Sequence, residues 1–121
     1  MTRVAAVDCG TNTIRLLIAD ARVAPGGGAV RLVPLVRLNE IVRLGQGVDA
    51  RGYLDPAAIE RTVEATVEYQ RMIEALGASR VRFVATSATR DAANSDEFTR
   101  EIRRVIGVDP EVVPGTEEAS L

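Results

Sequence analysis

The sequence predicts an α/β domain, in which helices pack on a mixed five-stranded sheet and the elements follow in the order β-β-β-α-β-α-β. Three observations support this fold class. Short apolar segments bounded by turn-forming residues predict three strands in the first third of the chain. Two longer segments with apolar residues at helical spacing follow, and each precedes another short apolar strand. A helix that joins two strands implies that they are parallel members of one sheet.

Composition places the chain among globular proteins and argues against two classes of partner. Its 121 residues suffice for about one domain, and 46% of them are apolar. The net charge is -2 and the aromatic residues are two Tyr and two Phe, so neither long-range attraction nor stacking favours nucleic acid. No apolar run approaches the roughly 20 residues that span a bilayer, so no membrane contact is expected. One cysteine and no secretory start indicate a reducing cytoplasm.

The first two strands are expected to form a hairpin with a polar tip. Val4–Val7 and Ile14–Ala19 are short apolar runs, and Asp8–Thr13 separates them. In that tip a glycine lets a ligand approach the backbone, and hydroxyl and amide groups lie beside successive N–H donors. Such a concavity suits a phosphate, although the same residue types also form ordinary turns. The candidate phosphate-binding residues are Gly10, Thr11, Asn12 and Thr13.

Asp8 and Cys9, at the end of the first strand, are expected to have different roles. The Asp8 carboxylate would repel a phosphate unless a cation lay between them, so it suits Mg²⁺ held mainly through water. Cys9 follows, but the chain has no histidine that could activate a thiol. We therefore expect Cys9 to be a small buried side chain and not a nucleophile.

The third strand, Val30–Leu38, is expected to lie at the edge of the sheet or to carry a bulge. It follows a flexible turn at Pro25–Gly28, and its Pro34 has no N–H to donate to a neighbouring strand. The first three strands then form an antiparallel meander. Gly45–Gly52 is rich in turn-forming residues and predicts an irregular surface connection to the first helix.

The first helix is expected to start at Asp55 as N-cap, with Pro56 at its first position, and to end at Gly77. Its buried face should consist mainly of aliphatic residues that pack against the sheet. These residues are Ile59, Val63, Val67, Ile73 and Leu76, with Thr66 and Gln70 between them.

The second helix is expected to close at Gly107. Asn94 and Glu97 lie three residues apart and resemble a capping box at its start. Its apolar side consists of Phe98, Ile102, Val105 and Ile106. Short strands at Val81–Ala85 and Glu111–Val113 complete the predicted sheet.

Ligands of open α/β sheets bind at the carboxyl ends of strands, where three polar segments of this chain could meet. They are the hairpin tip, residues 86–94 after the fourth strand, and residues 115–118 after the fifth. Arg90 could reach a phosphate there with its guanidinium, although a solvated surface arginine is the commoner outcome. Glu117 and Glu118 are favoured by the dipole of a helix that starts there, and one of them could orient a water for attack on phosphorus.

Three segments together resemble the exopolyphosphatase and guanosine pentaphosphate phosphohydrolase family. The connector Arg43–Val48 (RLGQGV) is similar to that family as well. The resemblance covers the whole chain, in order and with the family's spacing. The three segments are Asp8–Leu16 (DCGTNTIRL), Ala85–Asn94 (ATSATRDAAN) and Gly115–Ala119 (GTEEA).

The resemblance implies a ribonuclease-H-like lobe of the actin, sugar kinase and heat-shock ATPase superfamily, in which two such lobes enclose a phosphate-binding cleft. The hairpin tip would be the first phosphate loop, and Arg90 and Ser87 would hold substrate phosphates. Glu118 would be the catalytic base and, with Asp8, a ligand of the cofactor Mg²⁺ or Mn²⁺. The reaction would release the terminal phosphate of inorganic polyphosphate or the 5' γ-phosphate of guanosine pentaphosphate, an alarmone of the stringent response.

The family's second lobe is not in this chain, which stops as the third motif ends. We expect residues 1–121 to be the single amino-terminal lobe of a longer enzyme. Half a cleft supplies only part of the charge stabilisation that phosphoryl transfer needs, so the chain alone should turn over little or no substrate. The second lobe of the same enzyme is then a partner, and a homodimer is compatible with the resemblance.

Other functions remain as alternatives. One is a non-catalytic domain that binds polyphosphate or guanosine alarmones. Another is a phosphotransferase such as a sugar kinase, which shares the hairpin, although the Glu117-Glu118-Ala119 turn argues against it. A structural or interaction protein ranks last, because it leaves the coincidence of three motifs unexplained.

Overall fold

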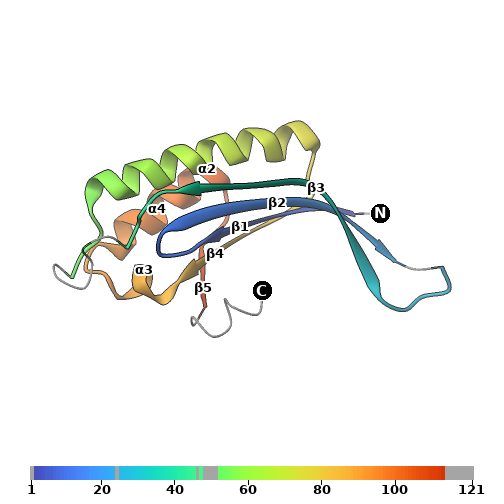
Figure 1. Ribbon diagram of the computed structural model, residues 1–121, viewed down its shortest axis with the longest axis horizontal. Coiled ribbons are helices and arrows are strands. Elements are labelled where there is room, and N and C mark those ends of the chain that lie inside the picture. The colour runs from blue at the N-terminus through green and yellow to red at the C-terminus, as the bar shows by residue number, and fades with distance from the viewer. Residues whose placement is uncertain (1, 24, 46, 48–51, 114–121) are drawn as a thin grey trace.

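The computed structural model describes residues 2–23, 25–45, 47 and 52–113. Within these ranges the predicted order β-β-β-α-β-α-β is confirmed, with one short additional helix, α3, directly after the fourth strand (Figure 1). The elements are β1 (Thr2–Cys9), β2 (Thr13–Val23), β3 (Val30–Ile41), α2 (Pro56–Leu76), β4 (Arg80–Thr86), α3 (Ser87–Asp91), α4 (Ser95–Ile106) and β5 (Glu111–Val113).

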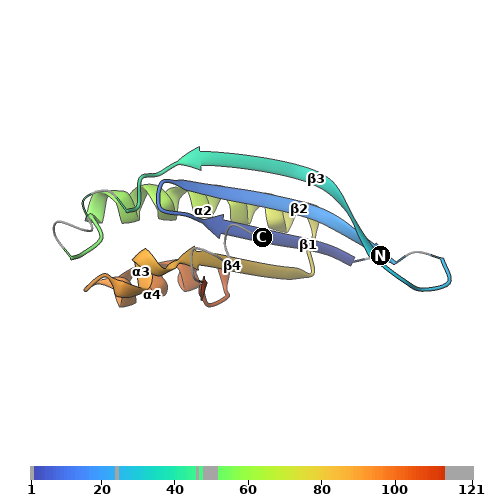
Figure 2. The ribbon, with the colours of Figure 1, turned by 60° about the horizontal axis from the view of Figure 1, so that its bottom comes forward.

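The five strands form one mixed sheet in the order β3-β2-β1-β4-β5. β1, β2 and β3 pair antiparallel, which confirms the predicted meander. β4 joins the open side of β1 in parallel, and β5 joins β4 in parallel (Figure 2). This arrangement follows from the connections, because hairpins link the first three strands whereas helices link β3 to β4 and β4 to β5.

Both expectations for the proline-containing strand are confirmed. β3 is an edge strand, and its register against β2 shifts at Pro34. Ile18 lies opposite Val36 and Ala19 lies opposite Pro34, which leaves Leu35 as the extra residue of a bulge. A bulge accommodates a residue that cannot donate to the ladder.

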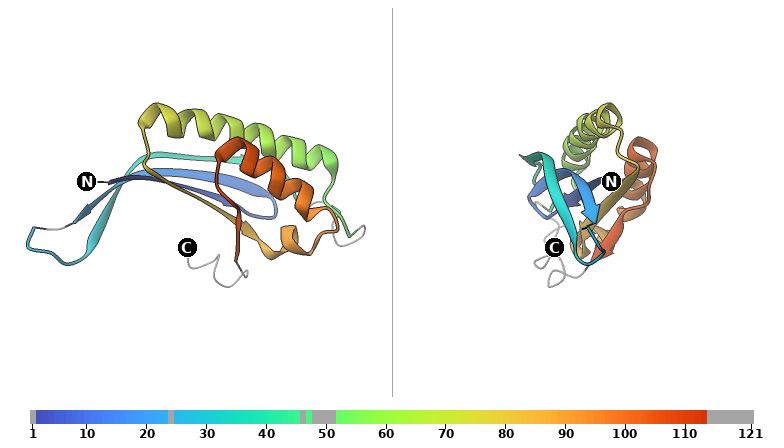
Figure 3. Two further views of the ribbon diagram at one scale, coloured as in Figure 1. Left: turned by 180° about the vertical axis from the view of Figure 1, so that it is seen from behind. Right: turned by 90° about the vertical axis from the view of Figure 1, so that its right-hand side faces the viewer.

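Helices α2 and α4 cover the same face of the sheet, and the hydrophobic core lies between them and the strands (Figures 1 and 3). Alternate residues of β1 face this core, among them Val7 and Cys9, each 0% exposed. Cys9 is thus the small buried side chain that the sequence predicts. Phe83 of β4 packs edge to face on Phe98 of α4, with ring centroids 6.5 Å apart. No helix within the described ranges is both long and apolar enough to cross a membrane.

Both ends of α2 lie where the sequence predicts. Asp55 is the N-cap, and its Oδ1 accepts a hydrogen bond from the Ala57 N–H at 2.9 Å. Gly77 ends the helix in the left-handed conformation, with φ 68°. That conformation suits glycine, which has no Cβ.

The predicted buried face of α2 is wrong in part. Tyr69, absent from the prediction, is 2% exposed, whereas four predicted members are only half-buried, namely Val63, Val67, Gln70 and Leu76. Polar side chains can occupy the buried face here because each hydroxyl has an acceptor. The two buried threonines donate to carbonyls one turn earlier, each at 2.8 Å, and Tyr69 donates to the Ile14 carbonyl at 3.1 Å. The buried residues of α2 are Ala58, Ile59, Thr62, Ala65, Thr66, Tyr69 and Ile73.

Asn94 precedes α4 as predicted, but the predicted capping box is wrong. The Asn94 side chain makes no capping hydrogen bond to α4. Its Oδ1 instead accepts from the Leu54 N–H at 2.8 Å, and its Nδ2 donates to the Leu54 carbonyl at 2.9 Å. Leu54 is 0% exposed, so its backbone groups need partners, and an amide supplies both a donor and an acceptor. Asn94 therefore ties the segment before α2 to the start of α4.

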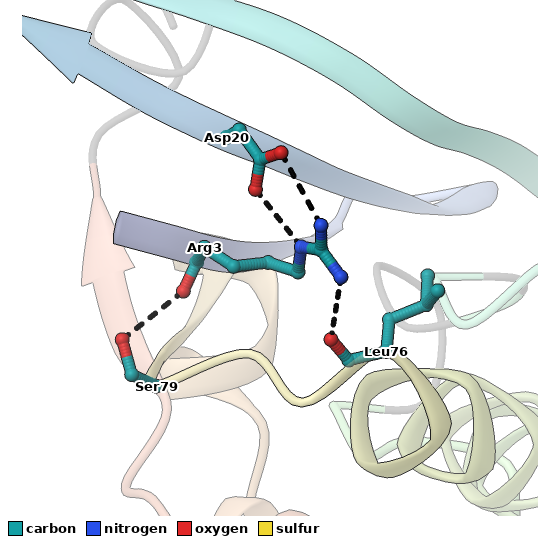
Figure 4. A network of polar contacts seen from close by, with 4 residues as sticks. All are labelled: Arg3, Asp20, Leu76 and Ser79. Atoms are coloured by element: carbon teal, nitrogen blue, oxygen red, sulfur yellow. Dashed lines mark hydrogen bonds and ion pairs between the residues drawn. The ribbon is translucent and has the colours of Figure 1, made fainter. Parts of the chain in front are cut away.

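A charged cluster joins Arg3 of β1 and Asp20 of β2 to the end of α2 (Figure 4). It lies at the end of the sheet opposite the hairpin between β1 and β2. Arg3 Nε and Nη2 donate to the two carboxylate oxygens of Asp20 at 2.9 and 3.3 Å, and Nη1 donates to the Leu76 carbonyl at 2.8 Å. The Arg3 carbonyl in turn accepts from the Ser79 hydroxyl at 3.2 Å. The hydrogen bond from Arg3 lowers the pKa of Asp20 below its ordinary value of 3.8, and this effect outweighs the opposing effect of burial.

The lowered pKa of Asp20 predicts an acid-dependent contribution to stability. A carboxyl whose pKa is lower in the folded state stabilises the fold fully above the unfolded value, and this contribution is lost as the pH falls through the folded value. We expect the difference in unfolding free energy between the wild type and Asp20→Asn to be constant above a pH of about 4 and to shrink in more acidic solution. Urea unfolding over a pH series measures it. A difference that persists unchanged into strong acid would contradict this prediction.

Candidate functional site

The carboxyl ends of β1 and β4 are neighbours at one edge of the sheet. The two strands are parallel, and Cys9 pairs with Ala85 close to their ends. The hairpin tip follows β1, and α3 follows β4 (Figure 2). The structure therefore brings two of the three predicted polar segments to the same edge, where open α/β sheets bind ligands.

The hairpin tip is shorter than predicted, because β1 runs to Cys9 and β2 starts at Thr13. Gly10 donates its N–H to the Thr13 carbonyl at 2.9 Å and closes the turn. Thr11 and Asn12 are exposed, and no group within the described residues accepts a hydrogen bond from their N–H groups. Two adjacent exposed N–H donors at a turn suit an anion.

The backbone of residues 42–45, which follow β3 and are called the connector from here on, holds the tip in place. The Asn12 carbonyl accepts from the N–H groups of Val42 at 2.8 Å and Arg43 at 2.9 Å, and the Thr11 carbonyl accepts from Gly45 at 2.8 Å. Carbonyl oxygens would repel an anion, and here both are occupied by protein donors. The connector thus occupies the Thr11 and Asn12 carbonyls of the tip and leaves the N–H groups of the same two residues available to a ligand.

The sequence indicated this connector only through its family resemblance and otherwise predicted a surface connection from Gly45 onward. In the structure Val42 and Leu44 anchor it, at 2% and 1% exposure. A Cβ on Gly45 would lie 2.2 Å from Thr11 Cγ2, so a glycine is needed where the connector meets the tip. The signal in the sequence is the alternation of buried apolar residues with arginine and glycine over residues 42–45. Most of Gln46–Arg51 lies outside the described residues.

A cavity of 490 Å³ lies beside the tip and connector. Its lining combines side chains of the tip with the end of β3 and the first residues of the connector. The lining residues are Asn12, Thr13, Ile41, Arg43 and Gly45.

Asp8 belongs to the opposite face of the sheet from the helices, because strand residues alternate and its neighbours Val7 and Cys9 face the core. It lines a second cavity, of 560 Å³, together with Arg15 and other residues of the central strands. Arg15 lies directly opposite Asp8 on β2. Arg15 was not among the predicted site residues, although the alternation along a two-stranded hairpin places it on this face.

The described residues offer few ligands for a divalent cation. Among the described residues no three acidic, cysteine or histidine side chains lie together as a metal site. Mg²⁺ commonly takes one or two carboxylates and completes its shell with water and phosphate oxygens. Asp8 alone therefore fits such an ion only if water and a bound phosphate supply the remaining ligands.

Arg90 and Ser87 both lie in α3, at the carboxyl end of β4. The Arg90 side chain is 62% exposed, and its Nε donates to the adjacent Asp91 at 3.1 Å. Exposed ion pairs contribute little, so this pair would not prevent Arg90 from binding a phosphate. No hydrogen bond or ion pair between described residues joins Arg90 to the hairpin tip. The roles assigned to Arg90 and Ser87 remain predictions.

Glu117 and Glu118 lie outside the described residues, together with the turn before them. Their predicted roles, as catalytic base and metal ligand for Glu118, also remain predictions.

The contact between Gly45 and Thr11 predicts a compensating pair of substitutions. Gly45→Ala should destabilise the fold by about 1–3 kcal/mol, because its new methyl group would overlap Thr11 Cγ2. Thr11→Ser removes that methyl group and keeps the hydroxyl, so the double variant Thr11→Ser/Gly45→Ala should recover most of the loss. Denaturant unfolding of the four proteins measures this cycle. A double variant no more stable than Gly45→Ala alone would show that the tip and the connector do not pack as described.

Comparison with known proteins agrees with the fold and the motifs. The model of the Ppx/GppA phosphatase family matches residues 21–121. Exopolyphosphatase 2 of Mycobacterium tuberculosis is 49% identical over all of this chain, which spans 39% of that protein. Guanosine-5'-triphosphate,3'-diphosphate pyrophosphatase of Aeromonas hydrophila is 35% identical over 95% of this chain, which spans 22% of that protein.

The solved structure of the Aquifex aeolicus Ppx/GppA family member superimposes on 96% of this chain with a TM-score of 0.82 and 33% identity. The match covers 36% of that chain. The predicted ribonuclease-H-like lobe of the actin, sugar kinase and heat-shock ATPase superfamily is therefore confirmed. Since the family model matches most of the chain and relatives of that family align along its length, the chain belongs to the Ppx/GppA phosphatase family.

Proposed function

We propose that this chain is the amino-terminal, phosphate-binding lobe of a phosphoanhydride hydrolase whose complete form contains a second lobe. The state of the hairpin tip is the main support for this proposal. Its Thr11 and Asn12 N–H groups are available to an anion, while the connector occupies the carbonyls of the same residues. At Thr11 and Asn12 the turn therefore presents the positive ends of peptide dipoles to a ligand.

The substrate is a chain of phosphates, which we take to be inorganic polyphosphate. Two relatives carry the names exopolyphosphatase and guanosine-5'-triphosphate,3'-diphosphate pyrophosphatase. The identity is 49% to the first and 35% to the second, and this difference favours polyphosphate. Guanosine pentaphosphate, hydrolysed at its 5' γ-phosphate, is the second candidate substrate, which would connect the protein to the stringent response.

The reaction is hydrolysis of the terminal phosphoanhydride bond. A water attacks the terminal phosphorus, its proton passes to the Glu118 carboxylate, and the bond to the bridging oxygen breaks, so that orthophosphate and a shortened chain leave. Arg90, at the carboxyl end of the strand beside the tip, donates to the phosphate oxygens, on which the negative charge lies. Ser87 adds a donor from the start of α3, and the tip holds the terminal phosphate through Gly10–Thr13.

A divalent cation, Mg²⁺ or Mn²⁺, would offset the negative charge of the substrate phosphates when bound. Asp8 would hold it through water, and Glu118 would be its second carboxylate.

The chain spans 39% of the exopolyphosphatase relative, which leaves room in such a protein for a second lobe. That lobe would face the hairpin tip and close the cleft in a cytoplasmic enzyme. This chain without it should hydrolyse polyphosphate slowly or not at all, because charge stabilisation from one side is incomplete.

Substitutions in the full-length protein separate the role of Glu118 as the base from the role of Arg90 in binding the phosphates. At saturating Mg²⁺, Glu118→Gln should lower kcat for polyphosphate by about 10²–10⁴-fold and change KM much less, because an amide cannot accept the proton of the attacking water. Arg90→Ala should raise KM as well as lower kcat, because its contacts with the phosphates form in the bound state and strengthen in the transition state. Steady-state phosphate release measures both values.

Arg104→Ala is the matched control for Arg90→Ala. Arg104 is 65% exposed and pairs with Glu101 on α4, as Arg90 is 62% exposed and pairs with Asp91. Loss of the Arg104 side chain should leave kcat and KM unchanged. Survival of polyphosphate and guanosine pentaphosphate hydrolysis in both Arg90→Ala and Glu118→Gln would refute the assigned roles, and binding without phosphate release by the wild type would indicate a sensor domain.

A further inference from the structure

Arg43 adopts a backbone conformation that is unfavourable for its residue type. Its φ is 53°, and it is the one non-glycine residue with positive φ in the described part of the chain. For a residue with a Cβ this left-handed conformation is costly, whereas glycine adopts it readily. A strained residue persists where its surroundings impose the conformation, and such positions cluster at functional sites.

The surroundings of Arg43 impose this conformation from three directions. Its N–H and that of Val42 both donate to the Asn12 carbonyl, at 2.9 and 2.8 Å. The neighbours Val42 and Leu44 are buried on either side, at 2% and 1% exposure. The Val42 carbonyl accepts from Arg61 Nε of α2 at 3.0 Å. The chain can satisfy all these contacts only by turning sharply at Arg43, which leaves the Arg43 side chain exposed.

That exposed side chain lies beside the candidate phosphate loop. Arg43 lines the 490 Å³ cavity together with Asn12 and Thr13 of the tip, and none of the described residues that line it is acidic. Within the described residues its guanidinium has no hydrogen-bond or ion-pair partner, in contrast to the arginines that form ion pairs. Those paired arginines are Arg3, Arg71, Arg82, Arg90, Arg103 and Arg104.

We propose that Arg43 is a substrate-binding residue, which holds an inner phosphate of a polyphosphate chain whose terminal phosphate lies on the hairpin tip. The inference rests on the proposed function and extends it to a second subsite. A guanidinium without a carboxylate partner binds phosphate oxygens through two parallel N–H donors. The connector hydrogen bonds to Asn12 fix the Arg43 backbone beside the tip, which keeps its guanidinium within reach of a phosphate chain bound there. Arg43 does not contact the reacting phosphorus and therefore acts on affinity.

Three variants of the full-length protein test this role. Arg43→Gln removes the charge at the strained position, Arg43→Gly removes the charge and also relieves the strain, and Arg100→Gln removes an exposed charge on α4 as a control. Both Arg43 variants should raise KM for inorganic polyphosphate about tenfold, the size expected for a lost hydrogen bond to a charged group, with kcat unchanged. Arg100→Gln should change neither constant. Arg43→Gly should melt no lower than the wild type, because glycine favours φ 53°.

Other results overturn the inference in distinguishable ways. Unchanged KM in both Arg43 variants, while Arg90→Ala raises it, refutes the Arg43 subsite and leaves the proposed function standing. A raised KM in Arg43→Gln with a normal KM in Arg43→Gly shows that affinity does not need the guanidinium, which also refutes it. If the wild type releases no phosphate, calorimetric titration with inorganic polyphosphate replaces the kinetics, and wild-type binding that Arg43→Gly does not weaken refutes the subsite. A wild type that neither hydrolyses nor binds polyphosphate refutes both proposals.

Discussion

The backbone hydrogen bonds between the hairpin tip and the connector are the constraint on which the candidate site depends. Asn12 and Thr11 each present a carbonyl that the connector occupies, at 2.8 to 2.9 Å. These bonds join residues about 30 positions apart in the sequence, and they fix which groups of the tip a ligand meets. Without them the turn would expose acceptors as well as donors, and it would no longer select for an anion. The strain at Arg43 and the requirement for glycine at position 45 both follow from this attachment.

The sheet and its helices serve to hold the tip beside the end of β4. Parallel pairing of β1 with β4 places the start of α3 next to the tip, because both strands end at the same edge. The core that fixes this pairing lies on one side of the sheet, under α2 and α4 (Figure 3). At the opposite end of the strands, Arg3 and Asp20 join β1 and β2 to the end of α2. The site is therefore built on rigid elements rather than on a long loop.

The sequence was sufficient for the order of elements, the edge strand with its bulge and the ends of α2, because periodicity, proline and helix caps act locally. It failed where a tertiary contact outweighed a local preference. Asn94 bonds to the buried backbone of Leu54 instead of capping α4, and Tyr69 is buried because Ile14, far away in the chain, offers an acceptor. For the site, the motif predicted the tip, whereas the left-handed turn at Arg43 has no local signal, since it depends on the position of Asn12.

Hydrogen exchange of the full-length protein, with and without inorganic polyphosphate, tests whether the connector prepares the tip to bind phosphate. The Val42, Arg43 and Gly45 amides should be protected in both conditions, because they donate to the tip. The Thr11 and Asn12 amides should exchange rapidly without polyphosphate and become protected when it binds. Rapid exchange of the three connector amides, or no gain of protection at Thr11 and Asn12 in the presence of polyphosphate, would contradict the claim that the connector prepares this turn to bind phosphate.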